Sequence, residues 1–164
     1  MFKVLDHFVK FERFVNVKKD NIMELLTSHS QDPLIQIFAT DSIAGNRQIL
    51  HSVYISLLAF KRKVNFAKNL QLEILLTLAQ VRQIKKAIEL MSPKKSDMII
   101  LATGTNEKKV LDVFEEAVKI LNGEKREITP IQKDSKHASE ITSNKIYSKE
   151  ELICENMALI ELLR

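Results

Sequence analysis

Four segments of the chain show the apolar patterns that predict β-strands. Residues 2–14 alternate bulky apolar and polar positions, which predicts one strand followed by a turn. Residues 33–40, PLIQIFAT, form a nearly continuous apolar run, as expected for a strand that is covered on both faces and central in its sheet. Residues 97–104, DMIILATG, predict another buried strand, and residues 126–131, REITPI, predict an edge strand because Pro130 has no N–H to donate.

Helical periodicity fills most of the sequence between and after these runs. A short helix is predicted after Asp20, and a longer one runs from about Ile49 to the basic residues 61–63. The remaining predicted helices are a stretch from about Ala67 to Ile88 with a break near Gln80, a helix capped by Thr105 that ends at Asn122-Gly123, and a C-terminal helix over residues 149–163. This order of elements predicts an α+β fold with a small mixed sheet, packed helices and a single domain over residues 1–164.

The segment LEILLTLAQVRQIKKAI, residues 72–88, changes character along its length. Its first half is apolar nearly all round, which predicts burial of residues 72–79 in the core. Its second half carries Arg82, Gln83 and two lysines. One apolar stripe is predicted to run through both halves, at Leu70, Ile74, Leu78, Val81, Ile84 and Ile88. We therefore expect a core-anchored helix that presents Arg82 and Gln83 rigidly, which lowers the ordering cost of binding a ligand.

Composition indicates an ordinary globular protein. The 164 residues are 45% apolar and 28% charged, and no apolar run approaches the roughly 18 residues that span a bilayer. The single cysteine, Cys154, cannot form an internal disulfide and is best explained as an apolar filler. These features favour a cytoplasmic protein with no membrane partner, with a nuclear location also possible in a eukaryote.

Positive charge is concentrated in one segment. Residues 61–95 contain nine basic and two acidic residues, a local balance of +7, whereas the whole chain carries +4. Charge gathered on one segment attracts polyanions, so this is where a phosphate-rich partner is expected. A solvated lysine face, without a ligand, is the alternative.

Motifs for catalysis are missing from the sequence. The three glycines stand apart, so neither a P-loop nor a dinucleotide fingerprint can form. The four histidines show no metal-ligand spacing, and no local motif activates a nucleophile. One alternative stays open: the turn ATGTNEKK, residues 102–109, could hold an anion at a helix N-terminus. We expect a protein that is not an enzyme by itself and that has no metal and no cofactor.

The run NFAKNLQLEILLTLAQVRQIKKAIELM, residues 65–91, resembles the small kinase-binding (Cgi-type) subunit of the KEOPS complex. The matching positions are Asn65, Ala67, the sequence EILL at 73–76, RQI at 82–84 and the pair Ala87-Ile88. Further likeness lies in QIL at 48–50, AF at 59–60, MIILA at 98–102 and the closing KIYSKEEL with MALIELL. The chain departs from the family at Ala79-Gln80, where a small residue and a glycine usually precede RQI.

The resemblance implies a noncatalytic subunit of the assembly that installs threonylcarbamoyl-adenosine in tRNA. It implies docking on the atypical kinase subunit, with support of its ATPase, and binding of the single-stranded CCA tail of tRNA. A single-stranded tail needs cations, amide side chains and flat or apolar platforms. The candidate phosphate contacts are Lys63, Lys68, Lys86 and Lys94, and the candidate base or ribose contacts are Asn65, Asn69, Arg82 and Gln83. A kinase-binding regulator without RNA contact is the alternative.

The C-terminal helix is the candidate kinase interface. Ile153, Met157 and Ile160 form one apolar stripe, and Leu152, Leu159 and Leu163 form a second. A second apolar face exceeds what one domain needs from a surface helix, so it favours a partner. Complete burial in the protein's own core is the competing explanation.

Overall fold

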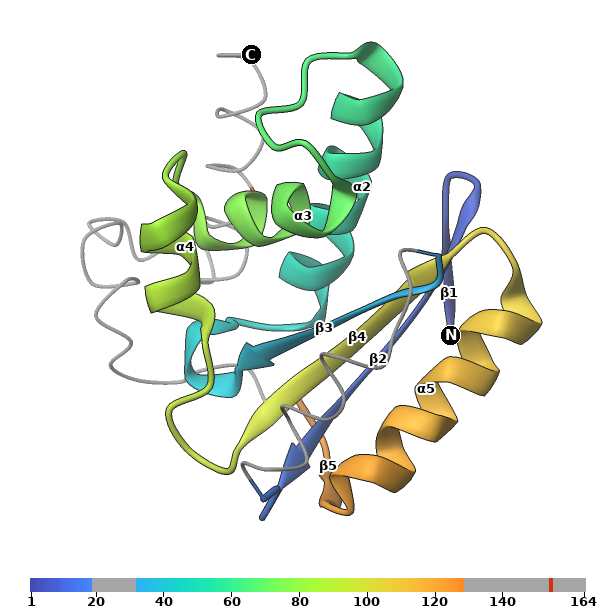
Figure 1. Ribbon diagram of the computed structural model, residues 1–164, viewed down its shortest axis with the longest axis vertical. Coiled ribbons are helices and arrows are strands. Elements are labelled where there is room, and N and C mark those ends of the chain that lie inside the picture. The colour runs from blue at the N-terminus through green and yellow to red at the C-terminus, as the bar shows by residue number, and fades with distance from the viewer. Residues whose placement is uncertain (19–31, 129–153, 155–164) are drawn as a thin grey trace, which may run out of the picture. The chain divides into compact units, whose positions relative to one another are not determined.

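The computed structural model describes residues 1–18, 32–128 and 154, and these divide into two units (Figure 1). Residues 1–18, 32–40 and 92–128 form the sheet unit, and residues 41–91 form the helical unit. The 3₁₀ turn Thr40–Ser42 lies where the chain passes from the first unit to the second. The prediction of one domain over residues 1–164 stays a prediction.

The sheet unit confirms the α+β class, with a sheet that is antiparallel in all its described pairings. Its strands are β1 (Phe2–Val4), β2 (His7–Val15), β3 (Leu34–Ala39), β4 (Met98–Gly104) and β5 (Glu124–Arg126). Their order is β1-β2-β4-β3, with β5 also paired to β2. Ala39 at the end of β3 pairs with Met98 at the start of β4, so the chain leaves and re-enters the sheet at the same end. A parallel pair would need the chain to cross to the other end, which explains why the expected mixed sheet did not form.

Three strand predictions differ in detail from the structure. β3 pairs only with β4 among the described strands, so it lies at the edge of the described sheet and not in its centre, although five of its six residues are buried. An apolar run indicates that both faces of a strand are buried, but it does not indicate which strands pair with that strand. Residues 2–14 form a hairpin and not one strand, because the chain turns at Leu5, which has a φ of 53°. The sequence did not indicate this turn, since neither glycine nor asparagine, the usual residues of such turns, is present there. The predicted strand at 126–131 begins two residues earlier and ends at Arg126.

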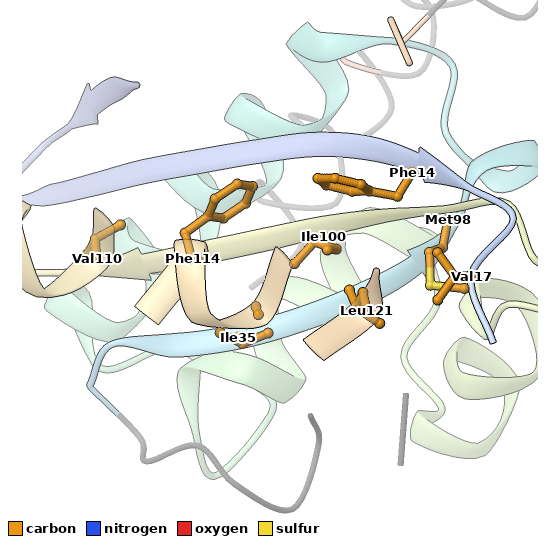
Figure 2. Packing of buried hydrophobic residues seen from close by; sticks show 10 residues of the cluster. Phe14, Val17, Ile35, Met98, Ile100, Val110, Phe114 and Leu121 are labelled. Atoms are coloured by element: carbon orange, nitrogen blue, oxygen red, sulfur yellow. The ribbon is translucent and has the colours of Figure 1, made fainter. Parts of the chain in front are cut away.

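Helix α5 (Glu107–Leu121) covers one face of the sheet (Figure 2). Apolar side chains from the helix and from strands β2, β3 and β4 form a cluster: Phe14, Val17, Ile35, Met98, Ile100, Ala102, Val110, Phe114, Ala117 and Leu121. The prediction of Thr105 as N-cap was wrong by one position, since the Asn106 side chain accepts the Lys109 N–H at 3.0 Å. The predicted end of the helix is confirmed, and Asn122 takes the left-handed conformation there with a φ of 45°.

A half-buried ion pair ties β2 to the start of β4. The Arg13 guanidinium donates from Nε to Asp97 Oδ1 at 2.9 Å and from Nη2 to Oδ2 at 2.7 Å, and the Thr40 hydroxyl donates to Oδ1 at 2.7 Å. The hydrogen bond from Arg13 is the main reason that the pKa of Asp97 lies below its usual value, and it also raises the pKa of Arg13.

The helical unit contains α2 (Asn46–Arg62), α3 (Leu70–Ala79) and α4 (Ile84–Met91) among the described residues. The predicted break near Gln80 is confirmed, and the predicted burial of residues 72–79 is confirmed except at Leu72 and Leu75, which are half-buried. The continuous stripe was wrong at its far end: Ile74 and Leu78 are buried, whereas Ile84 and Ile88 are 41% and 47% exposed. The chain changes direction between α3 and α4, so the helical phase starts again and α4 buries Ala87 and Met91 instead.

Several predictions lie outside the described residues. They are the short helix after Asp20, residues 129–131 of the predicted edge strand, and the C-terminal helix 149–163 with its candidate interface residues Ile153, Met157 and Ile160. Cys154, which is described, is helical and half-buried.

Candidate functional site

Left-handed turns end both α2 and α3 and set the direction of the segments that carry the candidate residues. At Lys63, with a φ of 61°, the N–H donates to Phe60 O at 3.1 Å, and the next N–H, of Val64, donates to Ala59 O at 3.0 Å. Gln80 repeats this arrangement with a φ of 54°, and the N–H of Val81 donates to Leu76 O at 3.2 Å. Both are Schellman motifs, which satisfy the last carbonyls of a helix while turning the chain away from its axis.

The loop between α2 and α3, residues 63–69, is held from inside the helical unit. The Ala67 N–H donates to Oε2 of Glu73 at 2.7 Å, and the Ala67 carbonyl accepts from the Asn65 side chain at 2.8 Å. Glu73 is completely buried, and Asn69 caps α3 by accepting the Leu72 N–H at 2.9 Å. Because side chains bond both backbone groups of Ala67, the loop has a defined conformation at this point.

This loop reaches the connection between α3 and α4. The Arg82 guanidinium carbon lies over the Phe66 ring, 5.1 Å from its centroid, which is a cation–π distance. Phe66 is 44% exposed, and Arg82 is exposed as well. Two residues on opposite sides of α3 in the sequence therefore form one exposed cation–π pair, named here the Phe66–Arg82 stack.

Four exposed cations of the helical unit have no carboxylate partner among the described residues. Lys63, Lys68, Arg82 and Lys86 are all exposed, and within the described residues none of them lies in an ion pair with a carboxylate. Glu73, one of the two acids counted in the basic segment, is buried and faces the loop backbone. The surface of residues 61–91 is therefore more strongly cationic than the formal balance suggests.

The remaining candidate residues are distributed unevenly. Asn65 and Asn69 each use one side-chain group for internal hydrogen bonds, so they shape the loop whatever else they contact. Gln83 is exposed in the connection to α4. Lys94 is also exposed, but it belongs to the sheet unit, and its position relative to the other candidates is not defined.

Sequence analysis missed Phe66 and Glu73. Phe66 had one visible signal, which is an aromatic residue that lies outside any helical stripe and directly after the polar Asn65. Glu73 gave none, because an acid inside a helical pattern is most often solvated and its hydrogen bond is to a backbone group outside the helix.

The alternative anion site at Gly104 is occupied by a carboxylate. Asp32 accepts from the Thr105 hydroxyl at 3.2 Å and from the Thr105 N–H at 3.4 Å. A Cβ at Gly104 would lie 2.6 Å from Asp32 Oδ1, so the glycine is needed for this close approach. A negative group already fills the turn, which disfavours a phosphate there.

Neither a metal site nor a membrane-spanning helix is found in the part of the chain that the structure describes. No group of three histidine, cysteine or acidic side chains lies close enough there to hold a metal ion. Among the same residues, no helix has the length and apolar character needed to cross a membrane.

The fold and site thus define an α+β protein with an exposed cationic surface and an arginine–phenylalanine stack. A family model, described as Kinase binding protein CGI-121, matches residues 14–161, and the chain belongs to this family of kinase-binding proteins. The match covers most of the chain and confirms the resemblance found in the sequence. No curated protein matches the chain significantly.

Proposed function

We propose that this protein is the noncatalytic kinase-binding subunit of the KEOPS tRNA-modification complex and that it holds the single-stranded CCA end of tRNA. Family membership supports the kinase-binding half. The observation that carries the RNA half is the set of exposed cations in the helical unit that have no carboxylate partner among the described residues, together with the Phe66–Arg82 stack in the same unit. A single strand offers phosphates to such cations and base faces to such a stack.

The RNA-binding surface comprises residues of the helical unit: Lys63, Asn65, Lys68, Asn69, Arg82, Gln83 and Lys86, with Lys94 as a further candidate in the sheet unit. The lysines neutralise phosphates, so binding depends on salt. The loop 63–69 is already ordered by Glu73 and Asn65, so little conformational entropy is lost when it binds.

Gel shifts with intact tRNA and with tRNA lacking the terminal CCA test the RNA half. We expect salt-dependent binding of the intact tRNA, loss of binding on trimming, and loss of binding by Arg82→Glu. Lys119→Glu on α5 is the matched control, since it reverses an exposed charge in the sheet unit and should leave the affinity unchanged. Equal binding of intact and trimmed tRNA would refute this half.

The competing function is a kinase-binding regulator that does not touch RNA. Charge reversal at Lys63 and Arg82 together would then leave the tRNA-modification activity of the reconstituted complex unchanged. The docking half is tested separately by Met157→Lys, which places a charge in the predicted apolar stripe and should release the kinase subunit in co-purification. If this variant retains the kinase subunit, the interface does not include the predicted stripe of the C-terminal helix.

A further inference from the structure

We propose that Phe66 and Arg82 form a stacking platform for one unpaired nucleobase, which adds to the guanidinium and ring as a third layer. This inference rests on the RNA-binding half of the proposed function and assigns a residue, Phe66, that the charge pattern does not indicate. The Arg82 guanidinium lies over the Phe66 ring at 5.1 Å. A planar guanidinium on a ring offers its outer face to a further planar group.

Exposure of an apolar ring is the first argument. Phe66 leaves 44% of its surface open, although Ala67, Ile74 and Leu76 are buried. Apolar area that stays in water does not contribute to stability, and the stabilisation that is lost is roughly 25 cal/mol for each Å². A nucleobase that stacks here would cover apolar area that the described chain leaves open.

The second argument is the way the loop is held. Glu73 and Asn65 bond the two backbone groups of Ala67, the residue directly after Phe66. Glu73 is fully buried, so its hydrogen bond fixes the loop from a protected position. The ring is therefore presented from an ordered backbone, as a stacking platform requires.

The third argument is the chemistry around the stack. Lys63 and Lys68 lie in the same loop as Phe66 and are exposed, and within the described residues neither pairs with a carboxylate. Arg82 likewise has no carboxylate partner within the described part of the chain. A planar group combined with phosphates, which is the chemistry of a single-stranded nucleotide, suits this combination better than an acidic peptide, which would not use the ring face.

A thermodynamic cycle between Phe66 and the ligand tests the platform. The probes are an oligoadenylate of roughly eight nucleotides and a series in which one nucleotide at a time is abasic, bound to wild type and to Phe66→Leu. We expect one position at which base removal weakens wild type by about fivefold or more but weakens Phe66→Leu by less than about twofold. Losses that multiply independently at every position would overturn the platform while leaving RNA binding intact.

Conservative variants separate stacking from charge and from folding. Arg82→Lys keeps the charge without the plane and should lose most of the affinity that Arg82→Gln loses. Phe66→Tyr keeps the ring and should bind within about twofold of wild type. Affinity of Arg82→Lys equal to wild type would overturn the platform, because only charge would then matter. Circular dichroism and thermal melting of each variant establish that it is folded.

The same experiment distinguishes failure of the proposed function. Wild type that binds neither tRNA nor the oligoadenylate at low salt would overturn both the RNA half and the platform. If Phe66→Leu in that case released the kinase subunit, the stack would belong to a protein interface and not to RNA.

Discussion

Replacing Gln80 by glycine should give a more stable protein than replacing it by alanine. Gln80 holds a φ of 54° and a ψ of 36°, a left-handed conformation that costs a residue with a side chain roughly 1–2 kcal/mol. Glycine adopts it without that cost but loses more chain entropy on folding, about 0.4–1 kcal/mol. The difference predicts that the free energy of unfolding of Gln80→Gly exceeds that of Gln80→Ala by about 0.5–1 kcal/mol. Both hydrogen bonds of the turn come from backbone N–H groups and are kept.

Urea unfolding of wild type, Gln80→Gly and Gln80→Ala measures the effect. The glycine variant should unfold at a higher urea concentration than the alanine variant with the same slope, and its Tm should be higher than that of the alanine variant by about 2–3 °C. The alanine variant keeps the conformational cost and loses the side chain, so it should be no more stable than wild type. Gln80→Gly that is no more stable than Gln80→Ala would refute the reasoning, because backbone conformation would then not limit stability at this turn.

Three further predictions concern buried or half-buried carboxylates. Asp97→Asn should lower the free energy of unfolding by about 1.5–3 kcal/mol in urea titrations, because it breaks a charge-assisted pair with Arg13. The pKa of Asp97 is lower in the folded state than in the unfolded chain, where it is about 3.9. The contribution of Asp97 to the free energy of unfolding is therefore complete above the unfolded-state pKa and is lost as the pH falls through the folded-state pKa. Thermal melting from pH 6 downward should therefore show a smaller loss of Tm in Asp97→Asn than in wild type, and parallel curves would contradict this. Glu73→Leu should cost about 1–3 kcal/mol by leaving the Ala67 N–H unpaired, whereas Glu73→Gln keeps an oxygen acceptor and should cost less; equal losses in the two variants would contradict the role of this bond.

Sequence patterns were sufficient where the determining interactions are local. The burial of β4, the periodicity of α5 and the stop at Asn122 all follow from residues that are neighbours along the chain. The break at Gln80 was also predicted, although the left-handed residue there is not glycine. Such features depend on period, capping and turn geometry, which a single sequence displays directly.

Patterns failed where the determining partner is distant. The place of β3 in the sheet depends on which strand pairs with it, and an apolar run does not encode that choice. Asn106 replaced Thr105 as N-cap while the Thr105 hydroxyl bonds Asp32, far away in the sequence. In the candidate site, the cations were visible in the sequence, but the contact of Arg82 with Phe66 required the path of the chain around α3.

The contact between Phe66 and Arg82 also depends on the length of α3. The helix separates the two residues in the sequence, and each helical residue turns the chain by about 100° and advances it by about 1.5 Å. One residue inserted in α3 would swing the guanidinium away from the ring without touching either residue. Homologous chains that keep this contact should therefore vary α3 by substitution and hold its length constant.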